Sequence, residues 1–195
     1  MADQLVVAAL RVVFLLYITL VLLHSSLERV YALRSRQRRT RPAAAAPGRW
    51  PAVDVVIPCF NEDPVLLEAC CRSVAGQDYP GRLRVWLVDD GSANRDALGG
   101  VYERWSDRGW GVRLLDRNTG KRAAQDEAVR RGGGELVVLM DSDTVLAPDA
   151  VRQAAACFAD DRVGAVSGSI GVLNGPTNLL TRLIHHRYRL RFQVE

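Results

Sequence analysis

Two aspartates one residue apart, Asp141 and Asp143, are the residues of this sequence best suited to hold a metal ion. They follow the apolar run 136–140, which is typical of a buried strand that delivers its next side chains to the edge of a sheet. Carboxylate oxygens are hard ligands that suit Mg²⁺ or Mn²⁺. An Asp-Ser-Asp tripeptide is also found in ordinary polar loops, so its meaning depends on the residues that accompany it.

Three further β-rich runs, at residues 53–57, 83–88 and 112–115, lead into polar side chains. The first run is expected to end at Pro58, because proline has no N–H for a strand ladder. The polar groups beyond the three runs are Asn61-Glu62-Asp63, Asp89-Asp90, and Asn118 with Lys121-Arg122.

Helical stretches are predicted between these runs, at 65–75, 95–106 and 123–131. Alternating strands and helices predict an α/β domain with a doubly wound, mostly parallel sheet. Because ligands of such sheets bind beyond the carboxyl ends of the strands, we expect the polar groups to face one pocket.

Two common phosphate-binding loops are missing from these strand ends. No Gly-x-Gly-x-x-Gly follows the first strand, which argues against an NAD-binding domain. Gly120-Lys121 is followed by Arg122 where a P-loop has serine or threonine, and Leu115 stands where a P-loop has its first glycine. The expected site therefore holds phosphate through a metal ion and cationic side chains. Lys121, the only lysine of the chain, is a candidate for such a cation.

Cysteine and histidine offer neither a zinc signature nor a disulfide framework. The cysteines form no Cys-x-x-Cys pair, and the histidines lie far from them in sequence. These residues are Cys59, Cys70, Cys71 and Cys157, and His24, His185 and His186.

The N-terminal segment is predicted to be a membrane anchor. Residues 5–23 are apolar apart from Arg11, Tyr17 and Thr19, close to the ~20 residues that a helix needs to cross a bilayer. A cleaved signal peptide is the alternative. Against it, no basic residue precedes the apolar run, and the alanines at 43–46 lie about 20 residues too late to mark a cleavage site.

Seven arginines and no acidic residue lie between Arg29 and Arg49. The positive-inside rule then predicts a single-pass protein of the cell membrane whose remaining chain lies in the cytoplasm. The arginines can contact lipid headgroups, and because they directly follow an apolar span we do not expect nucleic acid as a partner.

Four segments are predicted along the chain. Residues 1–27 form the transmembrane helix, 28–51 a basic linker rich in proline and alanine, and 52–176 the folded domain. Residues 177–195 are expected to form an amphipathic helix on the membrane surface, although its leucines would also suit a helix packed in a domain core.

Four motifs resemble, in order and spacing, the donor-binding half of family-2 glycosyltransferases. They are Pro58-Cys59-Phe60-Asn61-Glu62, Val88-Asp89-Asp90-Gly91-Ser92, Asn118-Thr119-Gly120-Lys121-Arg122 and Asp141-Ser142-Asp143. The resemblance covers residues 53–194 and is strongest toward the membrane-bound processive branch, hyaluronan synthases and chitin or nodulation-type chitooligosaccharide synthases. It implies a GT-A fold, a UDP-sugar donor (UDP-GlcNAc, UDP-GlcA or both), Mg²⁺ or Mn²⁺, and an inverting transfer that builds or extends a polysaccharide.

The resemblance also implies roles for individual residues. Phe60 would stack on uracil, where relatives commonly have tyrosine, and Asp89 or Asp90 would contact uracil and ribose. The full nucleotide-sugar set that it implies is Pro58, Phe60, Asn61, Glu62, Asp89, Asp90, Lys121, Arg122 and Asp141. Simpler interpretations remain open: Phe60 as a core aromatic residue, and Asp89-Asp90 as a helix cap.

On the phosphate side, Lys121 and Arg122 would lie near the diphosphate, and Asp143 with Asp141 would hold the metal ion. A cation placed on the developing charge of the departing UDP would lower the barrier to sugar transfer. The simpler interpretation of Lys121 and Arg122 is a solvated helix start.

No catalytic base is expected within this chain. In relatives, the base carboxylate and the Gln-x-x-Arg-Trp motif that grips the acceptor lie beyond the position of Glu195. Ser169 and Gly171 also stand where close relatives often carry an aspartate and a basic residue, so this chain departs from those relatives in residues expected to contact a carbohydrate acceptor. The alternative function is therefore a truncated, non-catalytic module that binds a nucleotide sugar or a partner.

Overall fold

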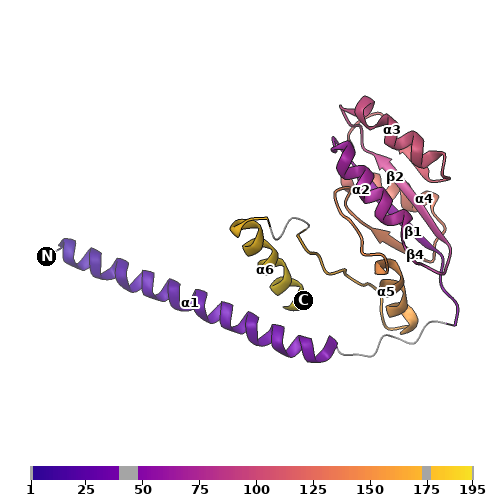
Figure 1. The fold of residues 1–195 in the computed structure, drawn as a ribbon. Helices are drawn as coiled ribbons and strands as arrows, with labels where there is room; N and C mark the ends of the chain where they lie inside the picture. The colour runs from indigo at the N-terminus through magenta and orange to yellow at the C-terminus, as the bar shows by residue number, and fades with distance from the viewer. Residues whose placement is uncertain (1, 40–47, 173–176, 195) are drawn as a thin grey trace. The chain divides into compact units, whose positions relative to one another are not determined.

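The computed structural model describes residues 2–39, 48–172 and 177–194 (Figure 1). Its elements are α1 (Ala2–Arg39), β1 (Val53–Cys59), α2 (Pro64–Ala75), β2 (Leu83–Asp89), α3 (Arg95–Ser106), β3 (Gly111–Leu114), α4 (Lys121–Arg131), β4 (Leu136–Leu139), α5 (Ala150–Ala156), the 3-10 turn η1 (Cys157–Ala159) and α6 (Leu179–Val194). They belong to two compact units: α1 and α6 lie in one, and all four strands with α2 to α5 lie in the other.

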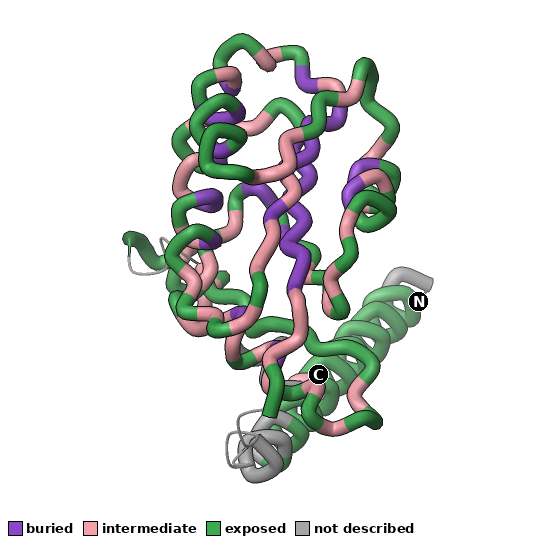
Figure 2. Tube along the Cα trace, turned by 90° about the vertical axis from the view of Figure 1, so that its right-hand side faces the viewer, coloured by how far each residue is buried: buried purple, intermediate pink, exposed green. Residues whose placement is uncertain are grey.

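The second unit is built on a four-stranded parallel sheet with the order β3-β2-β1-β4. One face packs on α2, α3 and α5 through a large apolar core that includes Ile57, Leu67 and Trp105. The other face packs on α4 through a smaller core in which Ala124 and Ala128 meet Val56 and Val88. Helices therefore cover both faces, as predicted for a doubly wound sheet. Buried residues run along the two central strands, β1 and β2, whereas β3 and β4 at the edges contain none (Figure 2).

Pro58 lies within β1 instead of ending it, which corrects the expected strand boundary. Alternate N–H groups of β1 face β2 and β4, and the Val53 N–H bonds to Arg82 on the β2 side. Proline at position 58 therefore turns its missing N–H toward β4. The ladder with β4 ends at Leu139, opposite Val56, so Pro58 lies beyond the part of β1 that pairs with β4.

Helix α2 starts as the sequence predicts. The Asp63 carboxylate accepts hydrogen bonds from the N–H groups of Val65 (2.7 Å) and Leu66 (3.4 Å), and Pro64 occupies the first turn, where its missing N–H has no cost. The start of α2 places the loop 60–63 over the carboxyl end of β1.

Helix α1 contains the apolar stretch Gln4–Tyr31, long and apolar enough to cross a membrane, and none of it is buried within the protein. No proline or glycine interrupts residues 2–39, so the helix continues to Arg39 through the first part of the predicted linker. Residues 40–47 lie outside the described part of the chain.

The end of the predicted linker belongs to the folded unit. Arg49 bonds to Glu135 (2.5 Å), and the Trp50 ring packs edge-on against Tyr79 with 5.5 Å between centroids. At the other boundary, the compact unit ends at Ser167 and residues 173–176 are not described. The predicted helix at 177–195 forms as α6, over Leu179–Val194.

Candidate functional site

A pocket of about 320 Å³ lies beyond the carboxyl ends of β1, β2 and β4 and beside the start of α4. Its lining comes from four separate segments of the chain. The lining residues are Pro58, Cys59, Phe60, Glu62, Asp90, Asn118, Lys121, Asp141, Ser142 and Asp143. Strand ends that are distant in sequence thus share one concave surface, as parallel pairing requires.

Asp141 and Asp143 present their carboxylates to this pocket, whereas Ser142 between them turns inward. Both aspartates are exposed, and Ser142 is buried. The Ser142 hydroxyl donates a hydrogen bond to the Glu62 carboxylate, which joins the loop after β4 to the loop after β1. Asp141 forms an ion pair with Lys121, and Asp143 forms no hydrogen bond or ion pair with the described residues.

The Lys121–Asp141 pair is open to rearrangement. Both side chains are more than half exposed, at 56% and 57%, so water can solvate either charge if the pair separates. Exposed ion pairs of this kind contribute only ~0–1 kcal/mol to stability. A negatively charged ligand can therefore replace Asp141 as the partner of the Lys121 ammonium group with little loss of fold stability.

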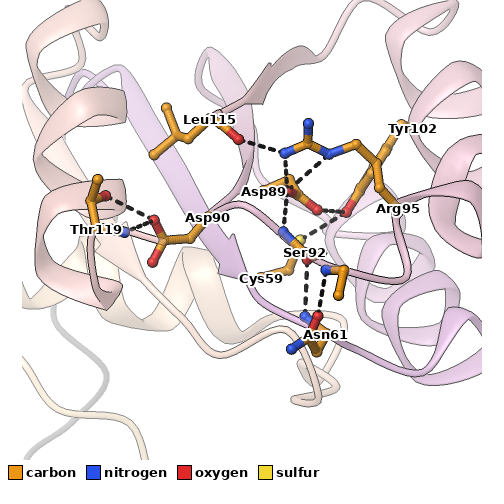
Figure 3. Close-up of polar contacts among 10 residues, drawn as sticks. Cys59, Asn61, Asp89, Asp90, Ser92, Arg95, Tyr102, Leu115 and Thr119 are labelled. Atoms are coloured by element: carbon orange, nitrogen blue, oxygen red, sulfur yellow. Dashed lines mark hydrogen bonds and ion pairs between the residues drawn. The ribbon is translucent and has the colours of Figure 1, made fainter. Parts of the chain in front are cut away.

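Asp90 lines the pocket but uses its carboxylate to hold the loop that leads to α4. It accepts hydrogen bonds from the Thr119 N–H (2.7 Å), the Thr119 hydroxyl (2.8 Å) and the Gly120 N–H (2.8 Å), as Figure 3 shows in part. Lys121 is the next residue and the first of α4. Asp90 thus fixes the backbone that carries the lysine into the pocket.

Asp89 lies beneath the pocket and is not part of its lining. Its fully buried carboxylate accepts hydrogen bonds from Tyr102, Arg95 and the Ser92 N–H (Figure 3). Burial by itself would raise the pKa of Asp89, but these hydrogen bonds outweigh it and hold the pKa below its usual range. Asp89 therefore stays ionised as an internal support of the site.

Asn61 links the loops after β1 and β2. Its N–H donates to the Ser92 hydroxyl (2.9 Å), and its amide oxygen accepts from the Ala93 N–H (2.7 Å). Its φ of 52° lies in the left-handed region, which asparagine tolerates better than most residues. Asn61 shapes the pocket without lining it.

Cys59 is a pocket-lining residue that offers no nucleophile. Burial raises the pKa of its thiol to about 12, so the thiolate is absent near neutral pH. The Tyr102 hydroxyl gives its one proton to Asp89, which leaves the Cys59 thiol as the donor in its 3.2 Å contact with Tyr102.

Seven of the residues singled out in the sequence lie in the lining of this pocket: Pro58, Phe60, Glu62, Asp90, Lys121, Asp141 and Asp143. Asn61, Asp89 and Arg122 are not among the lining residues. Asn118 also lines the pocket, as expected for a polar group that follows the third strand, although no role was predicted for it. Cys59 and Ser142 line the pocket without having been predicted, although each lies inside one of the recognised motifs. Their position inside those motifs is the sequence feature that could have identified them as pocket residues.

The donor atoms of the pocket fit a hard divalent cation. Among the described residues, no cluster of three or more His, Cys, Asp and Glu side chains comes together as a metal cage. Mg²⁺-type sites need only one or two carboxylates when phosphate oxygens and water complete the coordination. Asp143, whose carboxylate is exposed and unpaired, and Asp141 supply such a pair.

The sequence profile of Glycosyl transferase family 2 matches residues 54–195. The chain belongs to this family. Among its relatives, an N-acetylglucosaminyltransferase of Bradyrhizobium elkanii is 48% identical over 133 residues, which cover 68% of this chain and 73% of that protein. One of Mesorhizobium japonicum is 49% identical over 147 residues, covering 75% of this chain and 35% of the relative.

A solved structure of the mannosyltransferase PcManGT from Pyrobaculum calidifontis, in complex with GDP-Man and Mn²⁺, is also similar to this family-2 chain. Its sequence is 31% identical and its TM-score is 0.62, over 80% of this chain and 46% of that one. The parallel sheet and this neighbour confirm the predicted GT-A fold. Against three of the N-acetylglucosaminyltransferases the chain spans 35%, 39% and 40% of their length.

Proposed function

We propose that this chain is a membrane-anchored glycosyltransferase, or its donor-binding part, that takes its sugar from a UDP-sugar with the help of Mg²⁺ or Mn²⁺. The observation that carries the proposal is the pocket at the strand ends, whose lining includes two exposed carboxylates and the only lysine of the chain. Family membership and the N-acetylglucosaminyltransferase relatives favour UDP-GlcNAc as donor, with UDP-GlcA as the second candidate.

The nucleobase would stack on Phe60. This side chain lines the pocket and is 46% exposed, which is unusual for a core aromatic residue. Pro58 and Glu62 border the same part of the pocket, and the buried Asp90 carboxylate keeps lone-pair capacity for a ribose hydroxyl.

The diphosphate would lie between Lys121 and the two aspartates of the loop after β4. Lys121 would leave Asp141 and neutralise phosphate charge, while Asp143 and Asp141 would hold the divalent ion. When bound, that ion supplies positive charge to the diphosphate leaving group. Arg122, in the first turn of α4, would add positive potential near the same phosphates.

The transfer itself is proposed to be inverting, with the acceptor hydroxyl attacking the anomeric carbon as UDP departs. That attack needs a carboxylate to take the hydroxyl proton, and every carboxylate of the pocket is already assigned to the donor or to the scaffold. The polymer-building, processive character of the reaction belongs to the same proposal and rests on the resemblance of the motifs.

The anchor and the cytoplasmic orientation are proposals of the same kind. Helix α1 exposes an apolar surface along Gln4–Tyr31, and arginines follow it. Water-facing exposure of so much apolar surface would be costly, so lipid is the expected surrounding. The helix α6, with leucines and arginines mixed along it, would lie at the membrane surface.

A turnover assay tests the proposed activity. Membranes containing the full chain are incubated with UDP-GlcNAc or UDP-GlcA and Mn²⁺, and released UDP is measured. We expect release with UDP-GlcNAc that falls about 100-fold or more in Asp143→Asn, because the substitution removes a charged ligand of the metal site. Asp161→Asn, an exposed aspartate outside the pocket, is the matched control and should keep full activity. Nucleotide binding without release of UDP would identify a non-catalytic donor-binding module instead.

A further inference from the structure

The connection 115–120, between β3 and α4, determines where Lys121 stands in the pocket. It is held at its far end by Asp90, through Thr119 and Gly120. Its middle packs tightly on Gly91: a Cβ built at Gly91 would lie 2.4 Å from the Arg117 carbonyl carbon and 2.5 Å from the Asn118 nitrogen. The position of the connection is therefore dictated by the residues that follow β2.

The near end of the connection is held by Arg95, the first residue of α3. Its Nη2 donates to the Asp89 carboxylate and to the Leu115 carbonyl oxygen, at 2.6 Å in both cases, and its Nε approaches Asp89 at 3.3 Å (Figure 3). The Leu115 N–H bonds in turn to the Asp89 carbonyl oxygen at 2.9 Å. Arg95 thus joins the end of β2 to the residue at which the connection begins.

We infer that Arg95 is a positioning residue for the donor diphosphate: by fixing Leu115 against Asp89, it sets the course of residues 115–120 and hence the place of Lys121. This inference deepens the proposed function and rests on it. Arg95 does not line the pocket, and its contribution to donor binding would act entirely through the connection.

The competing explanation is that Arg95 only serves as one of the hydrogen-bond donors that stabilise the buried Asp89 carboxylate. Tyr102 provides the matched control, because its hydroxyl also bonds to that carboxylate (2.5 Å), whereas the side-chain hydrogen bond to the Leu115 carbonyl comes from Arg95. Tyr102→Phe removes one donor to Asp89 and leaves the Arg95–Leu115 bond intact. Loss of a hydrogen-bond donor to Asp89 predicts similar effects of the Arg95 and Tyr102 substitutions on donor binding, whereas positioning predicts an effect of Arg95 alone.

A double-mutant cycle tests the inference on the full chain in detergent, with UDP and Mn²⁺ as the probe in calorimetry. We expect Arg95→Met to raise the Kd for UDP about tenfold in the parent chain, equivalent to ~1.4 kcal/mol. In a Lys121→Ala background the same substitution should change Kd less than about twofold, because the side chain through which Arg95 acts is gone. An equal loss in both backgrounds, or an equal loss in Tyr102→Phe, would overturn the inference.

Two further measurements keep the test decisive if Arg95→Met folds poorly or if the parent does not bind UDP. Arg95→Lys keeps the charge but cannot reproduce the forked contacts, so it should fold and still weaken UDP binding by a smaller factor. Amide hydrogen exchange of residues 115–120 without ligand should become faster in Arg95→Lys but not in Tyr102→Phe. Unchanged exchange would refute the positioning role, whereas a parent chain that fails to bind UDP would refute the proposed function alone.

Discussion

The two ends of the parallel strands both carry aspartates, but the aspartates differ in what surrounds them. At the amino end, Asp54 is 1% exposed and accepts hydrogen bonds from Arg84 (Nε, 2.7 Å; Nη2, 3.0 Å) and from the N–H groups of Gly133 (2.8 Å) and Gly134 (2.7 Å). At the carboxyl end, Asp143 is exposed and unpaired among the described residues, and Asp141 meets only a half-exposed lysine.

This difference separates structural from functional carboxylates. The chain itself neutralises Asp54, and glycine is required around it because a Cβ at Gly132 would lie 2.3 Å from its Oδ2. The charges of Asp141 and Asp143 are left for a ligand to complete. Asp89 resembles Asp54, since its donors also come from the chain, although it lies at the carboxyl end.

The largest effect is expected from removing the structural carboxylate. Asp54→Ala leaves the Arg84 guanidinium and two glycine N–H groups without their acceptor, so we expect the free energy of unfolding to fall by about 3 kcal/mol. Asp126→Ala, which breaks an exposed pair with Arg130, should change it by less than about 0.5 kcal/mol. Urea denaturation followed by circular dichroism measures the free energy of unfolding of both variants. Equal effects would show that Asp54 is no more important to the fold than an exposed aspartate.

An intermediate effect is expected at Gly91, where backbone packing supports the pocket. Its φ of +74° is strained for alanine, and the added Cβ would clash with the backbone of Arg117 and Asn118. We expect Gly91→Ala to lower the free energy of unfolding by about 2–3 kcal/mol.

Gly109→Ala is the matched control for Gly91→Ala. It has a similar φ of +85°, but a Cβ there meets nothing within 4 Å, so only the backbone strain of about 1 kcal/mol remains. Thermal unfolding of the two variants measures how much stability each substitution removes. If Gly109→Ala were the more damaging substitution, the packing of residues 115–120 on Gly91 would not matter as proposed.

A smaller effect is expected from mild acid. For Asp54, Glu68 and Asp89, burial would raise the pKa, but hydrogen bonds from neighbouring side chains and N–H groups outweigh it and lower the pKa. Because the folded state then binds fewer protons than the unfolded state, these groups stabilise the fold above the unfolded pKa of about 4 and lose that contribution below it. We expect the free energy of unfolding to fall by less than about 1 kcal/mol between pH 7 and pH 4, and to fall more steeply below pH 4.

Denaturation at a series of pH values measures this dependence. Asp89→Asn should flatten the acid limb of the stability curve, since its amide cannot titrate. Stability that rises as the pH falls from 6 to 4 would contradict the lowered pKa values.

The sequence was sufficient for the alternation of strands and helices and for the edge at which the pocket lies. Apolar runs alternating with helices predict parallel strands, and parallel pairing brings the polar groups after each strand to one side. The burial of β4 was predicted wrongly, because β4 is an edge strand that leaves Val137 and Leu139 exposed. The extent of β1 could not be predicted from Pro58 alone. A strand tolerates a proline only where its missing N–H faces no ladder, and here that depends on where β4 ends. Likewise, the sequence contains no proline or glycine that would end α1 before Arg39.

The different roles of Asp89 and Asp90 could not be predicted from the sequence, for a physical reason. Adjacent strand-end residues point to opposite sides, and which of them faces the pocket depends on partners that lie far along the chain. Tyr102 and Arg95 draw Asp89 inward, whereas Thr119 engages Asp90 at the pocket. Only the folded structure brings these donors together.

Calorimetric titration of the full chain with UDP, with and without Mn²⁺, tests most directly whether the unpaired carboxylates serve a metal-bound nucleotide. We expect binding that requires Mn²⁺ and disappears in Asp143→Ala, while Asp161→Ala binds as the parent does. Equal affinity with and without the metal, in both the parent and Asp143→Ala, would contradict it.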